Sequence, residues 1–128
     1  MLFRLARLVM LVCAPAVAWA QDHGHSHHGG QEIKIGNYQA ELVVKGADVA
    51  LFVNDAKDQK VDASGLTATA VVLAKGNQQK TIQLVPAGEN KLAAKIDFPV
   101  EGKFRATVTL KNAGGELGKG RYNLDVTR

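Results

Sequence analysis

From residue 32 onward the chain consists of short runs in which apolar and polar residues alternate, and this pattern limits the fold more than any other feature. Alternation places every second side chain on one face, as a half-buried β-strand requires. It is clearest in 38–44 and 49–53, where Val49, Leu51 and Val53 share one face. Further runs cover 67–74, 80–85, 91–97, 104–110 and 122–126, with a short one at 33–35. The sequence therefore predicts an all-β domain of seven or eight strands.

Turn residues separate these runs and indicate how the strands are connected. Gly, Asn, Asp and Pro occupy 45–48, 75–78 and 86–90, and four glycines lie in 112–120. Connections this short join antiparallel neighbours. We therefore expect residues 32–128 to form an immunoglobulin-like antiparallel β-sandwich rather than a closed barrel. The aromatic side chains are expected in its core or at strand corners, namely Tyr38, Phe52, Phe98, Phe104 and Tyr122.

The first 20 residues have the pattern of an export signal. Arg4 and Arg7 precede an apolar stretch, and Ala18-Trp19-Ala20 supplies the small residues that a signal peptidase requires. The apolar stretch is about 13 residues long, whereas a membrane span needs roughly 20. The sequence predicts cleavage after Ala20, export, and no membrane insertion of the mature protein.

Removal of the signal changes the composition on which a function can be based. Removing 20 of 128 residues leaves 108, with 14 basic against 12 acidic groups and a net charge of +2. This weak charge gives no reason to expect nucleic acid or an anionic membrane as a partner. Cys13 and both methionines are lost with the signal, which excludes disulfides, thiol chemistry and sulfur ligands.

Residues 32–128 lack the groups that nucleophilic catalysis requires. They contain no His or Cys and a single serine, Ser64, so no imidazole is present to activate a hydroxyl. The acidic residues near 48–62 alternate with lysines and are interpreted as solvated loop charges. We therefore expect that the protein is not an enzyme.

All four histidines lie in residues 21–31, which we predict to be a flexible tail because they include no large apolar residue. Imidazole suits Cu(II), Zn(II) and Ni(II), and a flexible tail lets several rings converge on one ion. The candidate ligands are His23, His25, His27 and His28. The alternative interpretation is a solvated, low-complexity spacer that binds no physiological metal.

Cleavage after Ala20 would also create a terminal site, because the mature chain would begin Gln21-Asp22-His23. The amino group of Gln21, two deprotonated amides and the His23 imidazole can then surround Cu(II) or Ni(II) in a square plane. Cleavage after Ala18, or cyclisation of Gln21 to pyroglutamate, would remove this site.

Several segments resemble a known group of proteins. His28-Gly29-Gly30, GNYQAELVVKGADVALFVNDAKDQKVDASG and LVPAGENKLAAK are similar to small periplasmic proteins of proteobacteria, and to the N-terminal metal-associated domain of CzcB-type heavy-metal efflux adaptors. The resemblance covers most of residues 27–126. It implies an immunoglobulin-like periplasmic domain that handles a divalent metal, with His28 as the motif histidine and Glu41, in the similar strand, as a further candidate ligand. Nothing here corresponds to the coiled-coil, lipoyl or barrel domains of the adaptors.

Together these features predict a periplasmic protein that buffers or delivers Cu(II), Zn(II) or Ni(II), with a link to heavy-metal efflux or resistance. The alternative is a non-enzymatic interaction module. In that case the sandwich would dock on an efflux adaptor or another envelope protein through an edge strand, and the histidine tail would be incidental.

Overall fold

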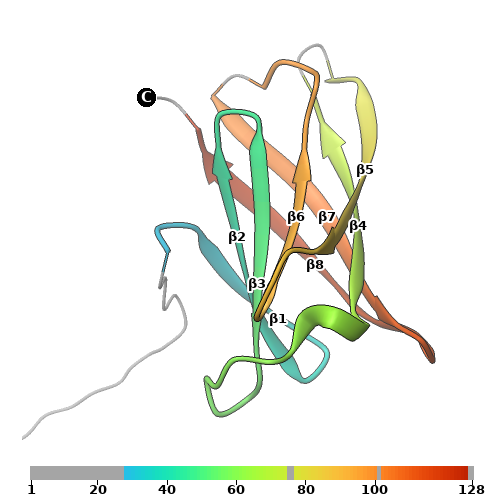
Figure 1. Ribbon diagram of the computed structural model, residues 1–128. Coiled ribbons are helices and arrows are strands. Elements are labelled where there is room, and N and C mark those ends of the chain that lie inside the picture. The colour runs from blue at the N-terminus through green and yellow to red at the C-terminus, as the bar shows by residue number, and fades with distance from the viewer. Residues whose placement is uncertain (1–27, 75–76, 101, 127–128) are drawn as a thin grey trace, which may run out of the picture.

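The computed structural model describes residues 28–74, 77–100 and 102–126 (Figure 1). The predicted signal peptide, 1–20, and four of the predicted ligands lie outside these residues, namely Gln21, His23, His25 and His27. The described secondary structure consists of β1 (Gln31–Ile35), β2 (Tyr38–Lys45), β3 (Asp48–Asn54), the short 3-10 helix η1 (Ala63–Gly65), β4 (Thr67–Leu73), β5 (Gln79–Pro86), β6 (Lys91–Lys95), β7 (Lys103–Asn112) and β8 (Gly115–Asp125).

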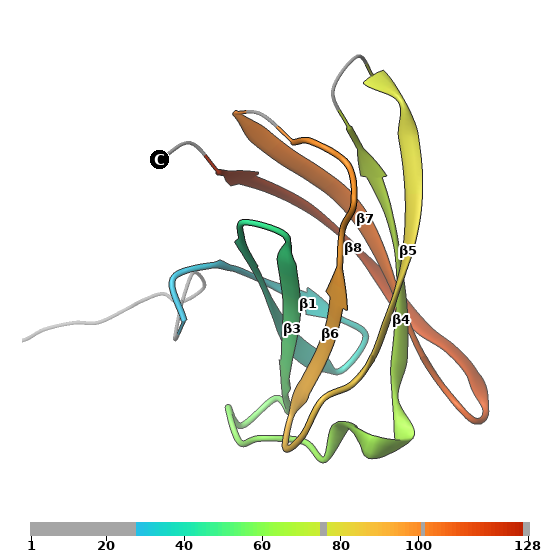
Figure 2. The same cartoon turned by 45° about the horizontal axis from the view of Figure 1, so that its top comes forward.

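All strand pairs are antiparallel, and the strand order is β1-β2-β3-β6-β5-β4-β7-β8. One layer contains β1, β2, β3 and β6, and the other contains β4, β7 and β8 (Figure 2). β5 joins the layers, because residues 79–84 pair with β4 whereas Val85 and Pro86 pair with β6. The predicted all-β, sandwich-like architecture is confirmed, and the shared strand makes it nearly closed.

The inward faces of both layers form one apolar core. Alternate residues of β3 are buried, as predicted, and the same holds for β4 and β7. The largest fully buried side chains are Phe104, Ile35, Leu42, Leu51, Leu84, Leu92 and Leu110. Tyr122 is also buried, and its hydroxyl donates to the Ala40 carbonyl oxygen at 2.8 Å, which ties β8 to β2 across the core.

The prediction that Phe52 belongs to the core is wrong. Its neighbours Leu51 and Val53 point inward and are fully buried, so the pleat places the Phe52 ring on the outer face of the sheet. The other aromatic predictions agree with the structure, since Phe104 and Tyr122 are in the core and Tyr38 and Phe98 pack against it.

The chain between β7 and β8 also differs from the prediction. Residues 112–120 were expected to form a turn, but β8 already begins at Gly115. The glycines in this strand allow β1 to approach closely, because a Cβ on Gly118 would lie 2.8 Å from the Gly36 nitrogen and one on Gly120 would lie 2.9 Å from Ile35. β1 and β8, the two ends of the strand order, therefore pack against each other. None of the described residues forms a helix long and apolar enough to cross a membrane.

Candidate metal centre

Residues 28–30 cross the outer face of β2 and are held there by one carboxylate. The backbone N–H of His28 donates to both Glu41 oxygens, at 3.1 and 2.9 Å, and the N–H of Gly30 donates to Oε2 at 2.8 Å. The Nδ1 atom of the His28 ring lies 2.9 Å from Glu41 Oε1. Residues 28–31 were predicted to be part of a flexible tail, 21–31. Instead residues 28–30 are hydrogen-bonded to Glu41, and Gln31 is the first residue of β1.

The two glycines of His28-Gly29-Gly30 make this arrangement sterically feasible. Gly29 has φ of +82°, a left-handed conformation that turns the chain so that the N–H groups before and after it converge on one anion. A Cβ on Gly30 would collide with the carbonyl group of Leu42. Glycine is therefore required at the first position for conformation and at the second for space.

Glu41 is only 2% exposed, although it lies on the outer face of β2. Residues 28–30 cover the Glu41 side chain on one side. On the neighbouring strand β3, the residue directly opposite Glu41 is Phe52. Burial of a carboxylate is costly unless its oxygens accept hydrogen bonds, and here they accept several. The hydrogen bonds with residues 28–30 thus stabilise the buried carboxylate, and the carboxylate in turn fixes that segment.

The imidazole of His28 is held by a ring stack on Phe52 and by its contact with the Glu41 carboxylate. It stacks on Phe52 with ring centroids 3.8 Å apart and an angle of 5° between the planes. The oxygens of an ionised Glu41 can only accept, and with that carboxylate Nδ1 carries the hydrogen that is donated. In the neutral ring the lone pair then resides on Nε2, and 41% of the side chain is exposed to solvent.

This geometry is the one that proteins use to prepare a histidine for a metal. Metal-bound histidines commonly donate their second ring N–H to a carboxylate, which sets the tautomer and raises the basicity of the ligating nitrogen. His28 and Glu41 have this relation, which leaves Nε2 as the ring nitrogen on the side away from the carboxylate. Among the described residues no group of three or more His, Cys, Asp or Glu is placed to hold an ion.

The structure thus brings together two of the predicted site residues, His28 and Glu41, which are separated by 13 positions in the chain. Glu41 was a candidate ligand, and its hydrogen bonds place it behind the imidazole; direct contact with a metal stays a prediction. Phe52, which was predicted in the core, is a further member of this site. The signal was present, because the alternation around Leu51 and Val53 already assigned position 52 to the outer face.

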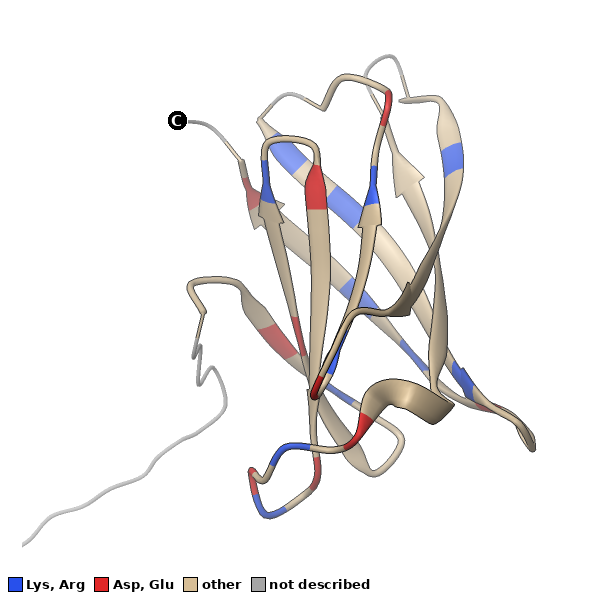
Figure 3. Cartoon of the chain, viewed as in Figure 1, with Lys and Arg blue, Asp and Glu red and all other residues tan. Residues whose placement is uncertain are grey.

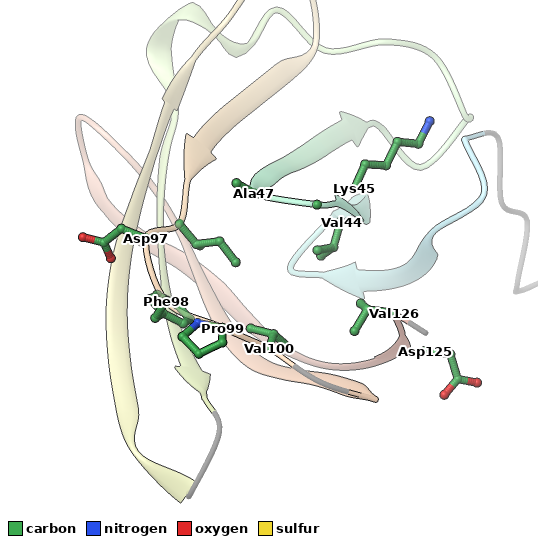
Figure 4. Close-up of a pocket in the computed structure, with 11 residues that line it drawn as sticks. Val44, Lys45, Ala47, Asp97, Phe98, Pro99, Val100, Asp125 and Val126 are labelled. Carbon is green, nitrogen blue, oxygen red and sulfur yellow. The ribbon is translucent and has the colours of Figure 1, made fainter. Parts of the chain in front are cut away.

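Away from His28, a hollow of about 580 Å³ opens at the end of the sandwich. It lies between the β2–β3 turn, the segment after β6 and the end of β8 (Figure 4). Val44, Val100 and Val126 line it, and the acidic residues at its edge are Asp97 and Asp125. It contains none of the predicted ligands.

No protein-family model matches the chain, and no curated protein matches it.

Proposed function

We propose that the protein binds a divalent transition-metal ion, Cu(II), Zn(II) or Ni(II), in the periplasm, and that it buffers or delivers this ion without turnover. The observation that carries the proposal is the hydrogen bond between His28 Nδ1 and the buried Glu41 carboxylate, at 2.9 Å. This bond orients Nε2 and makes it a better electron-pair donor.

A single imidazole is not a complete site, so we assign the remaining ligands to the preceding seven residues. His23, His25 and His27 lie directly before His28 in the chain, and the Gln21 amine joins them if cleavage follows Ala20. Because these residues are tethered to a fixed imidazole, their effective concentration around an ion on Nε2 is high. The absence of Cys and Met from residues 21–128 favours divalent ions over Cu(I).

The resemblance to efflux adaptors supports a role in heavy-metal handling, with an efflux adaptor or another envelope protein as the partner that gives or receives the ion. We do not assign the protein a part in pump assembly. The export signal predicted at 1–20 supports the periplasm as the location.

Calorimetric titration of protein 21–128 with each ion tests the proposal. We expect His28→Ala to weaken binding at least about 10-fold, and Glu41→Gln to weaken it about 10- to 100-fold, as loss of an orienting carboxylate does at other metal sites. Asp97→Asn, at the hollow near the end of the sandwich, is the matched carboxylate control and should bind each ion with the affinity of the wild type. Equal affinity of wild type and His28→Ala, or no binding tighter than about 10 μM, would exclude this function.

A further inference from the structure

A groove of about 610 Å³ lies beside His28 on the outer face of β2, β3 and β6. Strand register explains its shape. Val43, Ala50 and Ala93 lie opposite one another on the three strands and form an apolar floor of mostly small side chains. Val85 on β5 pairs with Ala93 and continues this row, and it is 53% exposed. The volume is in the range of sites for small organic molecules.

Longer side chains border the floor on both sides. One neighbouring row holds Phe52 and Lys91, with His28 stacked on Phe52. The other holds Lys45, Asp48 and Lys95, which Figure 3 shows as a basic, an acidic and a basic position at the same end of β2, β3 and β6. The groove is therefore apolar along its floor and basic along its rims.

The positive charge of the rims is only partly balanced. Asp48 accepts a hydrogen bond from Lys95 at 2.7 Å, and this bond lowers the pKa of Asp48, so the two charges offset each other. Neither Lys45 nor Lys91 has a carboxylate within ion-pair distance among the described residues. The Lys91 Nζ atom lies 5.9 Å from the Phe52 centroid and His28 lies 3.8 Å from it, so ammonium and imidazole are at most about 9.7 Å apart.

This charge arrangement affects which form of a metal the site can accept. A divalent ion on His28 Nε2 would add two positive charges to the rim of the groove that also carries the Lys91 ammonium, and Glu41 supplies one negative charge behind the ring. Repulsion between the ion and the lysine opposes binding of the bare ion. An anion that coordinates the ion and also contacts lysine would convert this repulsion into attraction.

We propose that the groove beside His28 binds a small polycarboxylate, and that the protein takes its metal as the complex of that anion. One carboxylate coordinates the ion on Nε2, another contacts Lys91 or Lys45, and the carbon skeleton lies on the row of Ala50 and Ala93. This inference rests on the proposed metal binding, and it adds the chemical form in which the ion is recognised.

Equilibrium dialysis of ¹⁴C-citrate against protein 21–128, with and without Zn(II), tests the inference. We expect about one citrate per protein only when Zn(II) is present. Lys91→Gln should weaken citrate retention about 10-fold, because one charge-assisted hydrogen bond is lost. Ala93→Phe should block it by filling the floor of the groove. Lys119→Gln, on the outer face of β8, is the matched control and should retain citrate like wild type.

Titration with Zn(II) alone separates this inference from the proposed function. Suppose that Zn(II) alone binds the wild type but not His28→Ala, and that citrate removes the ion equally from wild type and Lys91→Gln. Metal binding then stands, and the polycarboxylate site is excluded. If Zn(II) binds neither alone nor together with citrate, both proposals fail. A tetra-aspartate peptide tests the other source of carboxylates, and retention of the peptide in preference to citrate would assign the groove to an acidic protein segment and overturn the small-molecule proposal.

Discussion

At the scale of single residues, Gly30 is as important to the site as the two side chains that carry its chemistry. A Cβ at this position would overlap the Leu42 carbonyl, so Gly30→Ala must displace residues 28–30 from β2. We expect a loss of about 1–3 kcal/mol in the free energy of unfolding, together with weaker metal binding, because His28 would leave Glu41. Thermal denaturation and Zn(II) calorimetry measure the two effects.

Gly65→Ala is the control for this substitution, because a Cβ there would meet no atom within 4 Å and the backbone is not left-handed. It should change neither stability nor metal affinity by more than the error of the measurement. If Gly30→Ala behaved like Gly65→Ala, the close packing of residue 30 on β2 would be refuted.

Tyr122 gives a residue-scale prediction about alkaline pH. Burial raises the pKa of its hydroxyl well above the usual value, and the hydroxyl donates to the Ala40 carbonyl. The unfolded chain therefore loses this proton near pH 10 while the folded chain keeps it, so stability falls as pH rises above about 10, by up to about 1.4 kcal/mol per pH unit. Tyr122→Phe should be less stable at pH 7, by about 1–3 kcal/mol, but should lose less stability between pH 10 and 11. Urea denaturation at the three pH values decides this, and parallel losses in both proteins would contradict it.

At the scale of elements, the outer face of β3 supports the candidate site through Phe52. Because the Phe52 ring stacks on His28 rather than on the core, Phe52→Leu should cost little stability but should free the imidazole to rotate. The stacked ring shifts the His28 ring proton resonances upfield, and in Phe52→Leu we expect them to return toward their ordinary positions. The variant also loses the interaction between the two rings, which contributes about 0.5–1.5 kcal/mol. Phe104→Leu, in the core, should instead lower the melting temperature; unchanged His28 resonances in Phe52→Leu would refute the stack.

The packing of β1 against β8 depends on glycine. Gly120→Val would place side-chain atoms where Ile35 now lies, so we expect about 1–3 kcal/mol of destabilisation, measured by urea denaturation. Lys119→Val changes the neighbouring position, whose side chain points to solvent, and should have a small effect. Similar losses in the two variants would indicate that β8 does not require space at Gly120.

The same elements show how far local sequence patterns predict this molecule. Alternation predicted seven or eight strands, and each of the eight described strands overlaps one of its runs, because the period of two follows directly from which face meets the core. It did not reveal that 115–120 is strand, since the glycines there serve contact with β1, a partner distant in sequence. The contact of His28 with Glu41 was likewise invisible to spacing alone, because it depends on the left-handed turn at Gly29 and on the register of β1 with β2.

At the scale of the whole molecule, the proposed function divides the chain into a folded carrier that fixes one imidazole and a preceding segment that supplies the others. Deleting residues 21–27 should leave the metal-free protein folded, because all the described strands lie within residues 31–125. It should weaken Zn(II) binding by at least about 100-fold, since the tethered ligands are removed.

Metal binding in the intact protein should also depend on pH, because protons compete with the ion for imidazole nitrogen. An ion that binds only the folded form raises the melting temperature in proportion to the logarithm of its concentration over Kd. The Zn(II)-induced rise in melting temperature should therefore decline between pH 7 and pH 5 in protein 21–128, and should be small at both pH values in protein 28–128. A rise of equal size in the two proteins would show that residues 21–27 contribute no ligand, and would place the whole site on the folded domain around His28.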